Sequence, residues 1–210
     1  MKKLSSRVQI LIETLRGRYP VVKTQLTHES PFQLLIATIL SAQCTDNQVN
    51  KVTQVLFDHY PHASALAQAP LDGIKQIIFS TGFYNNKAKN IQACARALVE
   101  KHQGEVPDDM DALVALPGVG RKTANLVRSV AYDHQTMVVD THVLRLSNRL
   151  GLTRHKDAVK AEYDLMEIIP RESWNDLGLQ LIYFGREICD AKKPLCDQCP
   201  LYDICPTRGK

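Results

Sequence analysis

The chain has 210 residues, 44% hydrophobic and 23% charged, the composition of an ordinary globular protein with one large or two small domains. Its formal net charge of +4 permits a polyanionic partner without requiring one. No apolar run is long enough to span a bilayer, and Arg7, Gln9 and Glu13 interrupt the apolar core that a signal peptide needs. These features exclude an integral membrane protein, and we expect a soluble, cytoplasmic protein with no membrane partner.

Capping residues and apolar residues at helical spacing recur through the first half of the chain. Ser30-Pro31-Phe32-Gln33 resembles a capping box with proline at the first helical position. Asp46 is suited to cap the next helix, and Asn85-Asn86 to open a long helix that ends near Gly104. An N-terminal helix is indicated by Leu4, Val8, Leu11, Ile12 and Leu15.

The second half of the chain has the same pattern. Asp108 or Asp109 begins a short helix that ends at Leu116, and Asp140 precedes a helix that Gly151 terminates. Further helices are predicted over 121–131, 156–169 and 173–188. Two-residue alternation is nearly absent, and only 137–139 hints at a strand. The sequence therefore predicts an all-α protein.

Four of the six cysteines crowd into the C-terminal tail with the spacing C-x6-C-x2-C-x5-C. In a reducing compartment this crowding indicates a metal site rather than a disulfide framework. Only the inner two form the close pair that structural zinc sites usually repeat. Four thiolates without a histidine also suit a cubic iron–sulfur cluster, with zinc or unliganded cysteine as the alternatives. The four residues are Cys189, Cys196, Cys199 and Cys205.

Lys192 and Lys193 lie in the loop between the first two of these cysteines, just before Pro194. A bound cluster would stiffen this loop and hold both ammonium groups outward. Taken by themselves, the two lysines are more typical of a solvated surface.

Residues 116–127 read LPGVGRKTANLV, which predicts a compact hairpin of two helices. Gly118 and Gly120 permit backbone conformations and close approaches that a side chain would block. Amides of this turn and of the following helix can point outward together and bind an anion such as a backbone phosphate. A generic helical hairpin is the alternative.

Lys122 lies in the first turn of the second hairpin helix, directly after Arg121. A cation is least favourable at this end of a helix. Burial, the helix N-terminus and Arg121 would all favour loss of the ammonium proton, and only a neutral amine is a nucleophile. The position is therefore interpreted as activation, with a plain phosphate contact as the alternative. For Asp140, helix capping is the default role.

Four motifs in this order resemble endonuclease III, the bifunctional DNA glycosylase family of the helix-hairpin-helix superfamily. They are LPGVGRKTA at 116–124, VDTHV at Val139–Val143, LSAQCTD at Leu40–Asp46, and the spaced cysteine tail. The resemblance covers essentially the whole chain, from the entry at Ser30 to Cys205.

The resemblance implies a two-lobed fold. One lobe would be a six-helix bundle over 23–135, with the helix-hairpin-helix at about 109–131. Residues 1–22 and 136–210 would form a discontinuous cluster domain with a [4Fe–4S] loop at 189–205, whose ligands are the four tail cysteines. DNA would lie across the cleft, with Lys122 and Asp140 facing each other from opposite lips.

The resemblance also implies chemistry. A base excision repair enzyme of this kind removes an oxidised pyrimidine through a Schiff base on Lys122, and nicks the abasic site by β-elimination, while Asp140 takes up a proton and steadies positive charge. Its partner would be double-stranded DNA with damaged bases or abasic sites. We expect a monomer, associated with the nucleoid if the source is bacterial.

By the same resemblance, Gln43 fills the gap left by the flipped nucleotide, and Phe83 lies on the opposite side of the wedge, where the family often has leucine. Phosphate contacts would come from the hairpin turn and the cluster loop. These residues are Gly118, Val119, Gly120, Arg121, Lys192 and Lys193. We expect Cys44 and His142 to be structural or supporting residues.

Two other functions compete with this interpretation. A monofunctional adenine- or thymine-mismatch glycosylase would retain the hairpin and the cluster, but such enzymes generally lack the hairpin lysine. A non-catalytic DNA-binding hairpin protein would need neither Lys122 nor Asp140. The presence of both residues favours the bifunctional enzyme.

Overall fold

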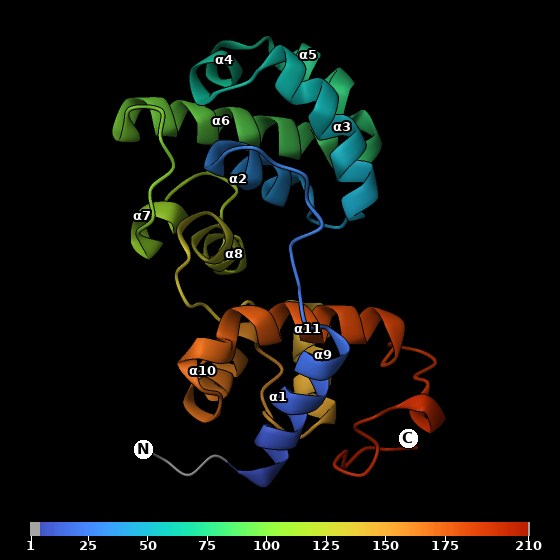
Figure 1. Ribbon diagram of the computed structural model, residues 1–210. Coiled ribbons are helices and arrows are strands. Elements are labelled where there is room, and N and C mark those ends of the chain that lie inside the picture. The colour runs from blue at the N-terminus through green and yellow to red at the C-terminus, as the bar shows by residue number, and fades with distance from the viewer. Residues whose placement is uncertain (1–4, 210) are drawn as a thin grey trace. The chain divides into compact units, whose positions relative to one another are not determined.

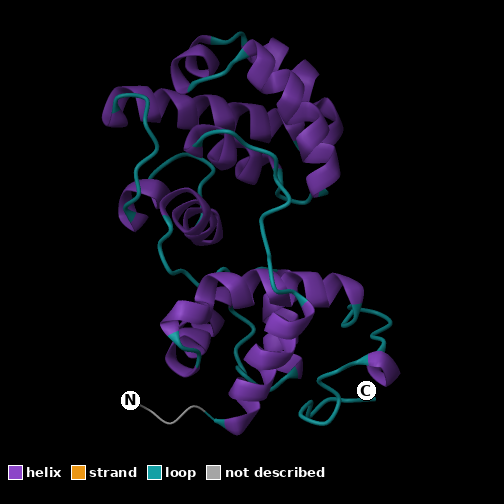
Figure 2. Ribbon diagram, viewed as in Figure 1, coloured by secondary structure: helices purple, strands orange, loops and turns teal. Residues whose placement is uncertain are grey.

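The computed structural model of the chain describes residues 5–209, and within that range it contains helices, turns and loops but no strand (Figure 2). The all-α prediction is confirmed. The hint of a strand at 137–139 is wrong, because this extended apolar segment pairs with no second strand and instead buries its side chains. Across the described part of the chain, none of the helices combines the length and apolar character that crossing a bilayer demands.

The chain divides into two compact units. The central unit is Thr24–His134; the terminal unit joins Met1–Lys23 to Gln135–Lys210, and the structure describes residues 5–23 and 135–209 of it. Each unit has its own hydrophobic core. Leu4, predicted as part of the N-terminal apolar stripe, lies outside the described residues.

The central unit is built around α2 (Pro31–Leu40), whose residues from Leu34 to Leu40 are all buried. Figure 1 shows α2 between α6 and α8, and it packs against both. The unit has seven α-helices where six were expected, because short helices of six and five residues are separate elements. The other helices are α3 (Asp46–His59), α4 (Ala63–Gln68), α5 (Leu71–Ile78), α6 (Tyr84–His102), α7 (Met110–Val114) and α8 (Arg121–Tyr132), with a 3₁₀ turn at Phe79–Thr81.

Local capping explains where these helices begin. Ser30 caps α2 by accepting from the Gln33 amide, and Asp109 caps α7 by accepting from the Ala112 amide, both as the sequence predicted. The predicted cap Asp46 is wrong by one residue. Thr45 has the extended backbone of a cap and accepts from the Gln48 amide, so Asp46 instead supplies a negative charge to the first turn.

The terminal unit packs α1 (Ser6–Arg18) and α9 (Thr141–Arg149) against α11 (Trp174–Glu187), with α10 (Ala158–Ile168) beside α9. The cysteine-rich tail continues from the end of α11 and contains a short 3₁₀ turn, Cys196–Gln198 (Figure 1). Arg7 ties the tail to α1, because its guanidinium donates to the carbonyl oxygen of Ile204 at 2.8 and 3.0 Å.

Candidate functional site

The turn of the hairpin between α7 and α8 requires glycine at one position. Gly118 has φ of +79°, and a Cβ added there would lie 3.0 Å from the Cβ of Asn90 on α6. Both the backbone conformation and the lack of space therefore exclude a side chain. Gly120 is different, because its φ of −96° is ordinary and nothing lies within 4 Å of an added Cβ. The absence of a side chain at Gly120 leaves room for a ligand instead.

The N-terminus of α8 exposes backbone donors beside Gly120. Ala124 donates the first helical hydrogen bond, to the carbonyl oxygen of Gly120, and no side chain caps the helix. Lys122 and Thr123 lie in the first turn of α8, where backbone amides point away from the helix, and such amides together with the helix dipole favour an anion. This arrangement suits a phosphate group.

Val119, one of the predicted DNA contacts, has a buried side chain. This side chain is only 7% exposed and packs in the core of the central unit, and the Val119 amide donates to the carbonyl oxygen of Leu116 at 3.1 Å. The turn folds this apolar side chain inward, since burial in the core stabilises it. A contact between Val119 and DNA stays a prediction, and it would involve the backbone of the turn.

Lys122 is the second residue of α8, and its side chain is exposed, while Arg121 before it is half-buried. The burial that the sequence led us to expect at Lys122 is therefore not found. Exposure leaves the amine accessible to a bound substrate.

Asp140 caps α9 in the terminal unit. Its Oδ1 atom accepts from the Val143 amide at 2.8 Å, and the residue is half-buried. The default role of this residue is thus confirmed. Because the cap uses one carboxylate oxygen, the second oxygen of this anchored group is available for other chemistry.

His142 is half-buried in α9. The pKa of its imidazole is lowered, mainly by burial; Asp140 opposes this shift, and Arg145 and Arg186 add to it. Gly185 on α11 allows the two helices to approach, because an added Cβ would lie 3.1 Å from Nη2 of Arg145 and 3.2 Å from the His142 ring. The close packing fixes the helix that carries Asp140.

Gln43 and Phe83 share an unusual backbone conformation. Their φ angles are +52° and +51°, in the left-handed region, and both side chains are exposed, Phe83 by 66%. This conformation costs a non-glycine residue about 1–3 kcal/mol and is concentrated at functional sites. Gln48, in the first turn of α3 after Gln43, donates to the Ser80 hydroxyl, in the 3₁₀ turn before Phe83, at 2.6 Å. The central unit therefore carries two exposed side chains in loops, and α3, which follows the first loop, is hydrogen-bonded to the second.

The four tail cysteines line one cavity of about 490 Å³, a volume that includes its opening to solvent. Burial raises the pKa of the Cys199 thiol, and the three neighbouring cysteines raise it further. Among residues 5–209, no three His, Cys, Asp or Glu side chains converge on the position of a single metal ion. A thiol-lined cavity of this kind fits a polynuclear iron–sulfur cluster.

Arg149, at the end of α9, also lines this cavity. Its guanidinium donates to the sulfur of Cys189 at 3.2 Å, and to the carbonyl oxygens of Asp190 and Ala191 at 2.7 and 2.9 Å. A cation beside a thiolate stabilises its charge. Arg149 therefore holds both the cysteine and the loop that follows it.

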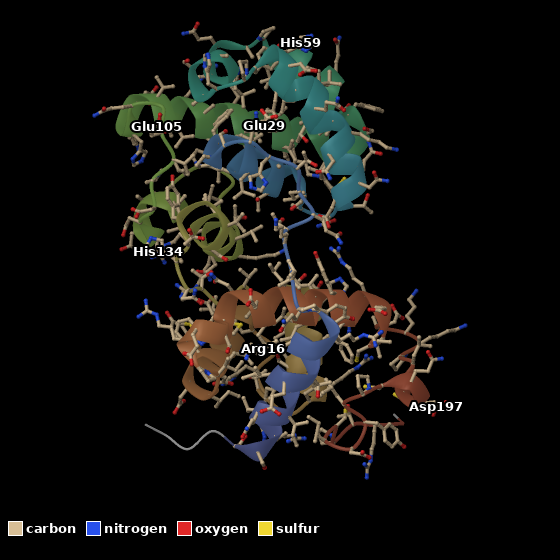
Figure 3. All side chains as sticks on the ribbon, viewed as in Figure 1. Arg16, Glu29, His59, Glu105, His134 and Asp197 are labelled. Atoms are coloured by element: carbon tan, nitrogen blue, oxygen red, sulfur yellow. The ribbon has the colours of Figure 1, made fainter. Side chains whose placement is uncertain are left out.

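Lys192 and Lys193 are exposed in this loop. Their backbone amides donate to Oδ1 of Asp190 at 2.8 and 2.9 Å, which lowers the pKa of that carboxyl group. The loop is thus ordered by backbone hydrogen bonds, which leave both ammonium groups in solvent. Asp197, farther along the same tail, is exposed as well (Figure 3).

Comparison with known proteins decides the family. Residues 36–171 match the HhH-GPD superfamily of base excision DNA repair proteins, and residues 189–205 match the iron–sulfur binding domain of endonuclease III. An endonuclease III from Synechocystis sp. is 49% identical over 211 residues, which cover 99% of this chain and 96% of that protein. The chain belongs to the endonuclease III family.

Further endonuclease III proteins agree in sequence and structure. The protein from Escherichia coli strain K12 is 43% identical, over 98% of this chain and 97% of its own. A solved non-covalent endonuclease III–DNA complex gives a TM-score of 0.92 at 45% identity, covering 96% of this chain and 94% of that chain. A trapped endonuclease III–DNA covalent intermediate, an estranged-adenine complex, also gives 0.92, at 46% identity over 96% and 95% of the two chains.

Membership in the endonuclease III family confirms the predicted class. The chain is a base excision repair enzyme, a DNA glycosylase with abasic-site lyase activity, that binds DNA. It carries an iron–sulfur cluster of the [4Fe–4S] type.

Two residues of this endonuclease III site were not predicted. Arg149 lies 40 residues before Cys189 in the sequence. From the sequence, an arginine at a helix end is interpreted as a cation that balances the helix dipole. Lys87 stands in the polar run YNNKAKN and reads as a surface residue, yet it is buried. Nothing in the local pattern distinguishes either residue.

Proposed function

We propose that Lys122 is the nucleophile with which this enzyme removes oxidised pyrimidines from duplex DNA and nicks the resulting abasic site. The observation that carries the proposal is an exposed lysine in the first turn of α8, next to backbone amides that suit a phosphate. The same anion site would bind the DNA backbone and bring the sugar within reach of the amine.

In the proposed reaction, the nitrogen of Lys122 forms a bond to C1′ of the deoxyribose, and the glycosidic bond breaks with its electrons leaving on the base. Loss of the amine proton and opening of the sugar ring give a Schiff base. Removal of a proton from C2′ then breaks the bond from C3′ to its oxygen, which cuts the strand on the 3′ side. Water releases the lysine.

Asp140 is proposed to take up a proton and stabilise positive charge on the sugar. Its anchored carboxylate supports the proposal, because the bond from Val143 fixes the group before substrate arrives. Prior organisation of this kind is a large part of electrostatic catalysis.

Recognition of the lesion is proposed to use two loops, 41–45 and 79–83, which we call the wedge loops. Gln43 would fill the gap left by the flipped nucleotide, and Phe83 would contact the unpaired base on the opposite strand. The exposure and left-handed backbone of both residues support this assignment. Flipping requires unstacking, and aromatic or polar wedges lower its cost.

Phosphate contacts are proposed at two places. In the hairpin they come from the amides around Gly118 and Gly120 and from Arg121; in the tail they come from Lys192 and Lys193. Exposed lysines on an ordered loop and an uncapped helix N-terminus support these contacts. Binding should weaken as salt concentration rises.

The cluster is proposed to be held by Cys189, Cys196, Cys199 and Cys205, the residues that line the cavity. When bound, it would cross-link the tail to the end of α11 through iron–sulfur bonds. On this proposal, residues 23–135 form the helix-hairpin-helix domain, and residues 1–22 with 136–210 form the cluster domain.

The natural partner is proposed to be double-stranded DNA with damaged bases or abasic sites, bound by a monomer. Association with the bacterial nucleoid follows from such a partner. The mild positive charge of +4 is compatible with that location.

Borohydride reduction tests the nucleophile, because it converts a Schiff base to a stable covalent adduct. With a duplex that contains an abasic site, the wild-type protein should form the adduct and Lys122→Ala should form none. Lys101→Ala, an exposed lysine in the last turn of α6, is the matched control and should react like wild type. An adduct that persists at the wild-type level in Lys122→Ala would refute the proposal.

A further inference from the structure

Lys87 is a buried cation at an unfavourable place. Its residue surface is 5% exposed, and it lies in the first turns of α6, near the positive end of the helix dipole. Burial lowers the pKa of its ammonium, and the nearby Cys44 thiol partly offsets this effect. An apolar side chain would fill the same space at lower cost. Simple packing therefore does not explain a lysine here.

Lys87 donates two hydrogen bonds to the wedge loop 79–83. Its Nζ atom donates to the carbonyl oxygen of Thr81 at 2.8 Å, and its backbone amide donates to the carbonyl oxygen of Phe83 at 3.1 Å. One residue therefore holds both sides of Gly82, whose φ of +69° lets the loop turn sharply there. The left-handed conformation of Phe83 follows directly after this turn.

A further hydrogen bond holds the same loop from outside. Gln48, in the first turn of α3, donates to the Ser80 hydroxyl at 2.6 Å. The loop 79–83 is therefore held by Lys87 from α6 and by Gln48 from α3, and it ends in the exposed, left-handed Phe83.

We propose that Lys87 is a positioning residue that braces the wedge loop 79–83 from inside, so that Phe83 is held ready to enter the duplex. This inference rests on the proposed function of that wedge loop. Without the brace, the loop relaxes from its left-handed conformation, and insertion then has to restore that conformation at the expense of binding energy.

The test compares Lys87→Met with Gln92→Met. Gln92 is also buried on α6 and also donates one side-chain hydrogen bond to a backbone carbonyl, that of Ala69, which lies outside the wedge loops. Both variants lose one buried polar contact, so a general effect on folding would appear in both. Thermal melting is measured for each with the cluster bound, and Lys87→Gln replaces Lys87→Met if the latter does not fold.

The probe is a duplex with a tetrahydrofuran abasic analogue opposite 2-aminopurine, whose fluorescence rises when the wedge unstacks it. We expect Lys87→Met to bind this duplex about tenfold more weakly than wild type, with a smaller fluorescence rise, and Gln92→Met to match wild type. On a natural abasic site, KM should rise while the single-turnover rate at saturating enzyme stays within about twofold, because Lys122 is untouched.

Equal affinity and fluorescence for Lys87→Met and wild type would overturn the brace, as would an equal loss in Gln92→Met. Failure of the wild-type protein to form the borohydride adduct would instead refute the proposed function. The two failures are therefore distinguishable.

Discussion

Asp140 accepts a hydrogen bond from the Val143 amide at 2.8 Å, which makes one carboxylate both the cap of α9 and the proposed catalytic group. The two roles can be separated, because asparagine caps a helix about as well as aspartate but carries no charge. We predict that Asp140→Asn lowers the single-turnover glycosylase rate by about a hundredfold or more. The free energy of unfolding should change by less than about 1 kcal/mol.

Asp157→Asn is the control for that substitution. Asp157 caps α10 in the same way, with Oδ1 accepting from the Lys160 amide at 2.9 Å, and it is exposed. Its rate should match wild type. A comparable loss of rate in both variants would mean that helix capping alone accounts for the effect.

The two glycines of the hairpin should respond differently to alanine. Gly118→Ala places a Cβ 3.0 Å from Asn90 at a positive φ, so we predict a loss of about 1–3 kcal/mol in unfolding free energy together with weaker DNA binding. Gly120→Ala meets open space at an ordinary φ, so the melting temperature should be kept while affinity for DNA falls, because the methyl group would obstruct phosphate approach. Wild-type affinity in Gly120→Ala would exclude close contact between this turn and DNA.

Arg149 should be needed to retain the cluster. Arg149→Met removes a charged donor from Cys189 and from the loop carbonyls of Asp190 and Ala191, contacts worth about 1.5–3 kcal/mol each at charged groups. We predict faster loss of the broad visible absorption when the folded protein is incubated with an iron chelator. Arg154→Met, an exposed arginine five residues on, should lose colour at the wild-type rate. Identical rates for all three proteins would show that the guanidinium does not protect the site.

Cys94 should be inert in the folded protein. It is fully buried in the core of the central unit, and burial raises the pKa of its thiol to about 12. Its reactive thiolate is therefore scarce at any pH well below 12, and alkylation at pH 8 should spare it while half-buried Cys44 is modified. Mass spectrometry of peptides after iodoacetamide treatment checks this, and early modification of Cys94 would contradict the packing of α6.

Much of the fold was predictable because local signals agree with the tertiary structure. Ser30, Asp109 and Asp140 cap the helices that they were predicted to cap. The errors occur where two local signals compete. Thr45 and Asp46 are both good capping residues, and the difference lies in which backbone is extended. The six-residue helix α4 was missed because so short a segment has little periodicity.

The site was predictable only in part, and mainly through motifs. Val119 was predicted to contact DNA together with its neighbours in the turn. Its side chain points inward because it packs in the core of the central unit, which the sequence of the turn does not reveal. Arg149 and Lys87 act on carbonyls and sulfur brought near by the fold, and no sequence spacing encodes such contacts. Residues that act through such contacts can be identified only from the three-dimensional structure.

The most direct test of the account identifies the atom that bonds to the sugar. The wild-type protein is reduced with borohydride on a duplex that contains an abasic site, and the adduct is digested and sequenced by mass spectrometry. We predict that the deoxyribose remnant is carried on Lys122 alone. Attachment to another lysine or to the N-terminal amine, with Lys122 unmodified, would contradict it.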